Sequence, residues 1–180
     1  MILQYLIFAI LTLLSPNKPL IIDFSLPKEA NKWVVVNDGV MGGLSKGKLT
    51  LTKEGVKFYG TVSLDNNGGF TSLRSPYSRL DLSQFQKLSI KYKSEGVLHA
   101  FQLEHHDRFY LPNHKLPLKN SEEWTIIEYD LRDLDQYQMG RKTNQKMNDD
   151  ALSKNIRLGF ITSEKRAGSF TLEIAEIRFY

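Results

Sequence analysis

Apolar and polar residues alternate along most of the chain beyond residue 19. The alternation is clearest in five stretches that carry an apolar residue at every second position: 49–51, 56–64, 88–92, 156–160 and 170–174. A period of two is typical of antiparallel strands that bury one face and expose the other. After Ile174 the apolar positions move to Ile177 and Phe179. This change of parity predicts a β-bulge near Ala175 and Glu176.

The same pattern predicts an all-β fold. Clusters of Gly, Asn, Asp and Pro separate about ten expected strands, and no helical crossover lies between them. This spacing is typical of an antiparallel β-sandwich or jelly roll. Two short helices are expected, at residues 26–33 and 148–155, the second with Asn148 as its N-cap. The most polar stretch, residues 133–150, is predicted to be a long loop, and residues 19–180 to form a single jelly-roll domain.

The start of the chain differs from the rest. Residues 1–15 are mostly apolar and carry no charged side chain. They are too few to span a bilayer, which takes about 20 residues, but they have the length of the apolar core of a signal peptide. We therefore predict that residues 1–18 are a signal peptide or N-terminal membrane anchor and that the protein is exported to the periplasm or cell envelope. Since no Lys or Arg precedes the run and no A-x-A site follows it, a buried segment of a cytoplasmic or membrane-associated protein is the alternative.

Charge and cysteine content exclude several classes of function. The net charge is +4, and the lysines are scattered. They often occupy alternate residues, as on the solvent-exposed face of a strand. No helix-turn-helix or RNP-type sequence accompanies them, so we do not expect a nucleic-acid partner. The absence of cysteine excludes disulfides, thiol catalysis, cysteine-ligated zinc and lipoprotein anchoring.

One glycine-rich stretch, residues 37–50 (NDGVMGGLSKGKLT), resembles two catalytic motifs. Residues 43–47 fit the G-x-S-x-G elbow of serine hydrolases, with Ser45 as nucleophile. Residues 42–48 fit a phosphate loop except that Leu49 replaces its final Ser or Thr. Both motifs must be followed by a helix, whereas residues 46–50 have a strand pattern. We therefore expect no enzyme activity and no cofactor, and little effect from Ser45→Ala.

The stretch still needs a structural explanation. Asn37, Asp38 and Gly39 are turn residues, and the pair at 42–43 marks a second point of tight backbone or close approach. Val40 and Met41 lie between them and are apolar. Two interpretations are open. Either the two side chains are buried under the sandwich as a plug, or they are exposed and contact a partner.

A second glycine-rich stretch, residues 63–75 (SLDNNGGFTSLRS), has Asn67-Gly68 between two strand-like runs, which is a hairpin signal. Asp65, Asn66 and Asn67 carry oxygens that suit calcium or a sugar, but no EF-hand spacing is present and a plain turn is favoured. Because the adjoining strands are expected to be sheet neighbours, we predict that the two glycine-rich stretches form one continuous patch.

Histidines and aromatic residues give weaker signals. His105 and His106 are neighbours and would point to opposite faces of a strand, so the four histidines (99, 105, 106 and 114), with Glu104 and Asp107, do not predict a metal site. Five aromatic residues would either form a sugar-stacking platform or belong to the core: Trp33, Tyr77, Tyr110, Trp124 and Tyr137.

Three blocks of the chain resemble the complex I intermediate-associated protein 30 family: WVVVNDGVMGGLS, FYGTVSLDNNGGFTSLRS and the terminal AGSFTLEIAEIRFY. The resemblance runs from about Leu20 to Tyr180. It is specific at Trp33, Asn37, Asp38, Gly39, Val40, Met41, Gly42, Gly43, Ser45, Phe58, Gly60, Asn66, Asn67, Gly68, Gly69, Phe70 and Arg74. One block departs, because the family tends to have Phe-Arg-Gly-Arg where this chain keeps only Gly140 and Arg141.

The resemblance implies a galactose-binding-like jelly roll without known catalytic residues, and an assembly or chaperone role that acts on a membrane or respiratory-complex subunit. A carbohydrate-binding module of the cell envelope is the alternative. The candidate binding patch comprises Asn37, Asp38, Val40, Met41, Ser45, Asn66, Asn67, Phe70, Arg74 and Arg141. The glycines expected to be structural are Gly39, Gly42, Gly43, Gly68 and Gly69.

Export is directly testable. If residues 1–18 direct the chain out of the cytoplasm, cell fractionation finds the protein in the periplasm or membrane, and a variant that lacks these residues stays in the cytosol. Full-length protein recovered from the cytosol with Met1 retained would rule the prediction out.

Overall fold

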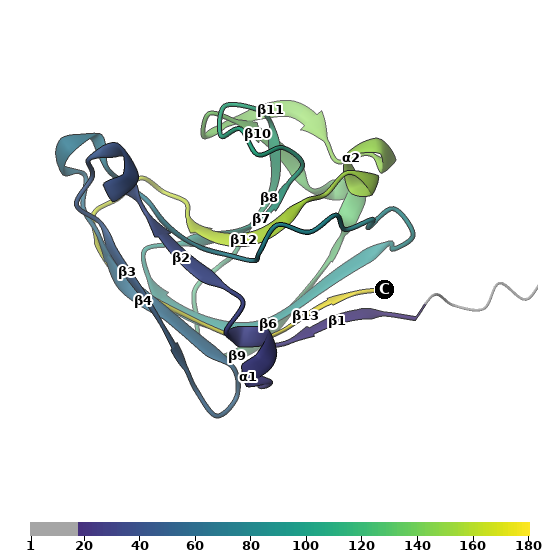
Figure 1. Cartoon of the computed structure of the whole chain (residues 1–180), viewed down its shortest axis with the longest axis horizontal. Coiled ribbons are helices and arrows are strands. Elements are labelled where there is room, and N and C mark those ends of the chain that lie inside the picture. The colour runs from purple at the N-terminus through teal and green to yellow at the C-terminus, as the bar shows by residue number, and fades with distance from the viewer. Residues whose placement is uncertain (1–17) are drawn as a thin grey trace, which may run out of the picture.

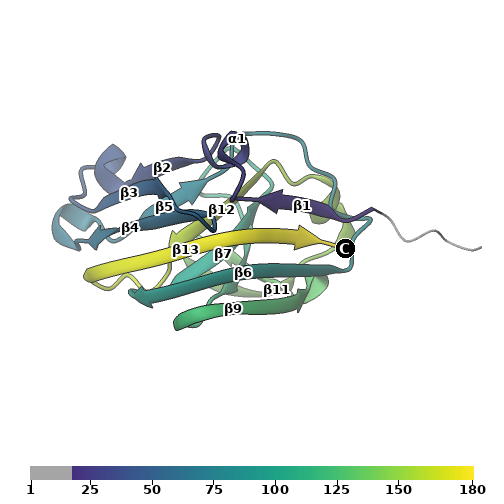
Figure 2. The same ribbon diagram turned by 90° about the horizontal axis from the view of Figure 1, so that it is seen from below.

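A computed structural model describes residues 18–180, so the predicted signal peptide or anchor lies almost wholly outside the described residues. These residues form thirteen strands in two antiparallel sheets, together with two short α-helices and three 3-10 turns. The two sheets pack face to face, with the helices at the periphery (Figures 1 and 2). The predicted all-β antiparallel sandwich is therefore confirmed.

The first sheet has six strands. Its order is β3-β4-β13-β6-β9, and β1 pairs with β13 at the other end of that long strand. The strands are β1 (Leu20–Asp23), β3 (Lys46–Leu51), β4 (Val56–Val62), β6 (Lys87–Gly96), β9 (Ser121–Asp130) and β13 (Gly168–Phe179).

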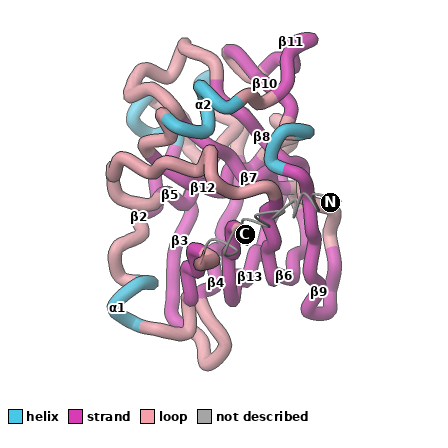
Figure 3. Tube along the Cα trace, turned by 90° about the vertical axis from the view of Figure 1, so that its right-hand side faces the viewer, coloured by secondary structure: helices cyan, strands magenta, loops and turns pink. Residues whose placement is uncertain are grey.

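The second sheet has seven strands in the order β11-β10-β8-β7-β12-β5-β2. It is strongly curved, so that its β10–β11 end stands beyond β7 and β12 on the side away from the first sheet (Figures 1 and 3). The strands are β2 (Val34–Asn37), β5 (Thr71–Arg74), β7 (His99–Glu104), β8 (Asn113–Pro117), β10 (Asp135–Gln138), β11 (Arg141–Lys146) and β12 (Arg157–Thr162).

The core lies between the sheets and follows the predicted alternation. In β6 and β13 the residues at every second position are buried, and the register of β13 against β6 shifts between Ile174 and Glu176, where the bulge was predicted. Leu51 and Leu64 were expected on the buried face but are 46% and 44% exposed, because β3 is an edge strand and β4 ends at Val62.

The two predicted helices are present but short. They are α1 (Pro27–Ala30) and α2 (Asp149–Ser153). Asn148 caps α2 as expected, since its Oδ1 accepts a hydrogen bond from the Ala151 amide at 2.9 Å. No helix in residues 18–180 is both long and apolar enough to cross a membrane.

Two connections differ from the predictions. Residues 133–150 are not a long loop: β10 and β11 form a hairpin whose turn residues Met139 and Gly140 have φ of 50° and 77°. The sequence hides these strands because both are mostly polar: β11 is the edge strand of the sheet, where a strand can be polar on both faces, and β10 lies next to it. Conversely, the Asn67-Gly68 turn does not close a hairpin, because β4 and β5 belong to different sheets and residues 63–70 cross between them.

The end of β13 should be essential for stability. Phe179 is fully buried, so Phe179→Ala should lower the free energy of unfolding by about 3–5 kcal/mol. Arg178 precedes it on the solvent side, and Arg178→Ala should cost at most about 1 kcal/mol. Urea unfolding followed by tryptophan fluorescence measures both; equal losses in the two variants would contradict the placement of Phe179 in the core.

Candidate functional site

The carboxylate of Asp38 is the centre of the region where the two glycine-rich stretches meet. Asp38 is 1% exposed. Its Oδ1 accepts a hydrogen bond from the Ser45 amide at 2.9 Å, and its Oδ2 accepts one from the Ser45 hydroxyl at 2.5 Å. The amides of Gly69 and Phe70 also donate to Oδ2, at 2.7 and 3.2 Å. The stretches therefore lie side by side, as their sequences predict.

The glycines make room for this carboxylate. A Cβ on Gly43 would lie 2.3 Å from Asp38 Cγ, and one on Gly68 would lie 2.6 Å from Asp38 Oδ2. Gly42 and Gly69 instead allow a backbone conformation that other residues rarely adopt, with φ of 88° and 131°. Two pairs of glycines thus let two loops close over one buried charge.

Asn37, next to Asp38, is hydrogen-bonded to one strand of each sheet. Its Oδ1 accepts hydrogen bonds from the Gly47 amide at 2.8 Å and from the Thr71 hydroxyl at 2.6 Å. Gly47 belongs to β3 in the first sheet, and Thr71 to β5 in the second. Asn37 and Asp38 therefore join the two sheets at one end of the sandwich.

The buried carboxylate is stable as an anion. Burial raises the pKa of Asp38, but hydrogen bonds from the Ser45 side chain and from three backbone amides outweigh it and leave the pKa below its ordinary value. A carboxylate with four donated hydrogen bonds has little capacity left for a ligand. Asp38 is thus a structural group within the candidate patch.

Ser45 is also structural, which corrects the prediction that Ser45→Ala has little effect. Its side chain is buried, donates to Asp38 and accepts a hydrogen bond from the Ser63 amide at 3.1 Å. It is followed directly by β3, so neither the elbow nor the phosphate loop has its helix.

Val40 and Met41 point into solvent, so the plug interpretation is wrong. They are 76% and 68% exposed and belong to a 3-10 turn (Asp38–Met41). Leu44, which the sequence did not single out, and Leu64, which was expected to be buried, are 53% and 44% exposed beside the hydrogen-bonded pair Ser45 and Ser63. We call Val40, Met41, Leu44 and Leu64 the loop patch.

The other predicted patch residues take different positions. Asn66 and Asn67 are exposed in the turn between the sheets, with φ of 54° and 59°. Arg141 does not join the patch, since β11 and the patch-bearing β2 are opposite edges of the seven-stranded sheet. Arg74 lies at the far end of β5. Gly39 has neither a positive φ nor a close neighbour, so nothing in the structure requires glycine there.

A second group of functional side chains covers the outer face of the seven-stranded sheet. The ladder places these residues on one face in two rows: Arg74, Gly159, Gln102 and Lys115, then Arg157, Glu104, Asn113 and Tyr137. We call this the polar face. Gln102 and Glu104 are 3% and 8% exposed although they point away from the core. The sequence does carry a signal for this face, because Gln102 and Glu104 occupy alternate positions in the stretch 99–104.

The five aromatic residues do not form one platform. Trp33 is in the core, packed on Phe24 with ring centroids 5.0 Å apart. Trp124 lies on the outside of the first sheet, under Lys91 and Lys93. Tyr77 and Tyr137 belong with the polar face: the Arg157 guanidinium lies 4.1 Å from the Tyr77 ring, and Lys115 Nζ lies 5.4 Å from the Tyr137 ring.

His99 is separate from the neighbouring pair His105 and His114. His99 is 1% exposed between the rings of Phe58 and Phe170, and burial lowers its pKa to about 3. His105 Nε2 lies 2.8 Å from His114 Nδ1 beside a hollow of about 220 Å³. Within residues 18–180, no group of three or more His, Asp or Glu residues is arranged to hold a metal ion.

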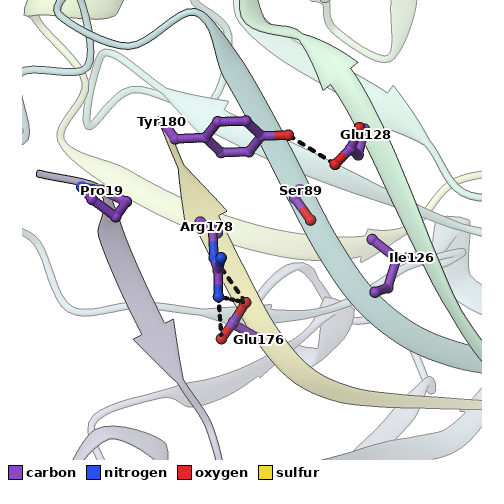
Figure 4. A pocket seen from close by; sticks show the side chains of 7 residues that line it. All are labelled: Pro19, Ser89, Ile126, Glu128, Glu176, Arg178 and Tyr180. Carbon is purple, nitrogen blue, oxygen red and sulfur yellow. Dashed lines mark hydrogen bonds and ion pairs between the residues drawn. The ribbon is translucent and has the colours of Figure 1, made fainter. Parts of the chain in front are cut away.

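A hollow of about 510 Å³ lies on the outside of the first sheet (Figure 4). Its ionisable side chains are paired with one another. The Tyr180 hydroxyl donates to Glu128 at 2.9 Å, and Arg178 forms an ion pair with Glu176 at 3.0 Å. These four side chains therefore already have partners within the hollow.

Comparison with known proteins decides the family. The family model for complex I intermediate-associated protein 30 matches residues 22–174, which is most of the chain. The chain belongs to the complex I intermediate-associated protein 30 family. This match includes both glycine-rich stretches and hence the Asp38 centre. No curated protein matches the chain in sequence.

Solved structures similar to this family member include carbohydrate-binding modules. A family 11 module from Clostridium thermocellum, in complex with a β-1,3-1,4-mixed-linked tetrasaccharide, is 14% identical with a TM-score of 0.58; the match covers 82% of this chain and 88% of that one. The family 11 module of the cellulase Lic26A-Cel5E of the same organism is 15% identical, also at 0.58, covering 82% and 86%. A family 29 module is 11% identical at 0.51, covering 90% and 85%. At these identities the likeness establishes the jelly-roll fold.

The Asp38 centre makes stability depend on pH. Asp38→Asn should lower the free energy of unfolding by about 3 kcal/mol at neutral pH, and Ser45→Ala by about 1–3 kcal/mol, because each leaves buried donors or acceptors without partners. Since the folded pKa of Asp38 is depressed, its contribution is present above about pH 4 and is lost as pH falls through the folded value.

The difference between wild type and Asp38→Asn should therefore shrink as urea unfolding is repeated from pH 6 down to pH 3. Asp65→Asn, at an exposed carboxylate in the neighbouring loop, is the control and should cost less than about 1 kcal/mol. A difference that stays constant over this range would contradict an ionised Asp38.

Proposed function

We propose that this chain is a non-catalytic binding module that acts by docking a protein partner through the loop patch. The observation that carries the proposal is the exposure of Val40 and Met41, 76% and 68%, on a turn anchored by a buried carboxylate. Membership of a family named for association with complex I intermediates supports a protein partner and an assembly role.

The rigidity of the turn supports binding. The amides and side chains around Asp38 hold both loops in one conformation, so a partner does not have to order them. Association costs less free energy when the contact surface is already ordered. Exposed large apolar side chains on such a surface are the usual anchors of protein contacts.

The charges beside the loop patch indicate what the partner presents. Lys165 packs against Gly69, where an added Cβ would lie 3.1 Å from its Cγ, and Lys165 and Arg166 are exposed. Lys46, next to Ser45, is exposed as well. The same loops also carry two exposed carboxylates, Asp65 and Glu164, the second of which is paired with Arg166 at 3.8 Å, so cations remain in excess. We therefore expect a partner surface with an apolar centre and acidic residues at its rim.

Carbohydrate binding is the second candidate function, and one observation favours it. Tyr77 and Tyr137 stand on the polar face beside Arg157 and Lys115, and sugar-binding sites combine aromatic rings with polar side chains in this way. The solved structures of similar fold include a module described in complex with a tetrasaccharide. This candidate uses a different surface from the loop patch.

The docking proposal can be tested by native gel electrophoresis of detergent-solubilised membranes from the source cells. We expect the tagged wild-type chain to migrate in a discrete larger complex, and the double variant Val40→Asp/Met41→Asp to lose at least 90% of it while keeping its melting temperature within about 2 °C, because solvent-exposed substitutions change stability little.

The matched control is Leu51→Asp/Ile126→Asp, which adds the same charges to two exposed apolar residues of the first sheet. It should leave the complex intact. If both double variants bind as the wild type does, or if both lose the complex equally, the loop patch is not the docking surface.

A further inference from the structure

The polar face carries more positive charge than its carboxylates balance. Arg74 and Lys115 stand in one row and Arg157 in the next, around the carboxylate of Glu104. All three cations are half-buried. Asp135 follows Lys115 in its row, but its carboxylate is already paired with Lys142 and Lys146. Charges withdrawn from water are costly unless a counter-charge accompanies them, so this excess requires an explanation.

Glu104 is already occupied by its immediate neighbours. Arg157 donates to its Oε2 from Nε at 2.8 Å and from Nη2 at 2.5 Å, and Gln102 Nε2 donates to its Oε1. Arg74 donates only from Nε, to the Ser72 hydroxyl at 2.8 Å. Among residues 18–180, no carboxylate forms an ion pair with Arg74 or Lys115. The free edge of one guanidinium and one ammonium therefore remain without an acidic partner.

The electrostatics agree with this geometry. Burial lowers the pKa of both Arg74 and Lys115, and the negative charge of Glu104 raises both again in part. The positive charge of Arg157 lowers the pKa of Arg74 further, and that of Arg74 lowers the pKa of Lys115 further. A guanidinium nevertheless stays charged in proteins. A bound anion would relieve the repulsion among these cations.

The shape of the face suits an extended ligand. Gly159 lies between Arg74 and Gln102 in the ladder and adds no side chain of its own, so the Gln102 side chain lies flat against it, with Cγ 3.5 Å from where a Cβ on Gly159 would be. Tyr77 is 56% exposed and has one ring face against Arg157, and Tyr137 stands on the opposite side beyond Glu104 and Asn113. The curvature of the sheet brings the β10–β11 hairpin up along this side (Figure 1).

We propose that the polar face binds a saccharide that carries carboxylate groups, a uronic acid oligomer, with the free edge of Arg74 and Lys115 binding the carboxylates and Tyr77 stacking on a sugar ring. Guanidinium groups bind carboxylates through paired hydrogen bonds, as Arg157 and Glu104 do beside it. This inference rests on the second candidate function, carbohydrate binding, and adds the class of sugar. An acidic peptide supplies the charge but not the rigid rings that flat aromatic faces accept.

Isothermal titration calorimetry of the full chain with tetragalacturonate tests the proposal. We expect binding in low salt, weakened at least tenfold by Arg74→Gln and at least fivefold by Tyr77→Ala. The matched controls lie on the outside of the first sheet: Lys48→Gln and Tyr59→Ala remove the same kinds of group and should change affinity less than twofold. Tetraglutamate, of equal charge, should bind at least tenfold more weakly than tetragalacturonate.

The outcomes distinguish failure of carbohydrate binding as such from failure of the proposed acidic class of sugar. Binding of a neutral mixed-linked glucan tetramer that Tyr77→Ala abolishes and Arg74→Gln leaves unchanged would overturn the acidic ligand and keep carbohydrate binding. No binding of either tetrasaccharide would overturn both. Equal binding of tetraglutamate, or equal loss in Lys48→Gln, would show attraction by net charge and overturn the site. Lys115→Gln replaces Arg74→Gln, with the same expected loss, if that variant fails to fold as judged by its melting temperature.

Discussion

The arrangement of one end of the molecule depends on a single buried carboxylate. Asp38 accepts hydrogen bonds from two loops that are separated by more than twenty residues in sequence, and its neighbour Asn37 does the same for a strand in each sheet. A charge buried in this way destabilises the fold unless every acceptor position is filled. The loops around it therefore have little freedom, and the glycines at 43 and 68 are the residues that allow such close approach.

This constraint explains why the stretch resembles catalytic motifs without their chemistry. A serine between glycines is what a nucleophile elbow needs, and it is also what a buried carboxylate needs when a small donor must approach it closely. Here the Ser45 hydroxyl donates to Asp38 and accepts from a backbone amide, so it is committed to structure. The same turn that buries Asp38 leaves Val40 and Met41 outside, since four residues of 3-10 helix cannot place every side chain inward.

The sequence predicts those parts of the fold that depend on local periodicity. The alternation in β6, β12 and β13, the bulge after Ile174 and the Asn148 cap all follow from nearest neighbours along the chain. The β10–β11 hairpin was missed because an edge strand that is polar on both faces has no periodicity to detect. The supposed 63–75 hairpin was wrong because turn residues do not specify which sheet the following strand enters.

In the candidate site, too, the local features can be predicted from the sequence and the long-range contacts cannot. The glycine-rich stretches can be recognised from sequence, but the hydrogen bonds that separate Asp38 and Ser45 from the exposed Val40 and Met41 depend on contacts across 31 residues. The polar face is harder still to predict, since its members come from β5, β7, β8, β10 and β12. Only the strand order places Arg74 and Lys115 on either side of Gly159 and Gln102.

The two candidate surfaces are linked by one short strand. β5 begins at Thr71, which is hydrogen-bonded to Asn37 in the Asp38 region, and ends at Arg74 on the polar face. Inward and outward residues alternate along it, so Leu73 packs in the core while Ser72 and Arg74 face outward. A ligand on the polar face and a partner on the loop patch would therefore bind near opposite ends of β5, and neither would have to displace the other. That geometry suits a module that holds a ligand and a protein partner together.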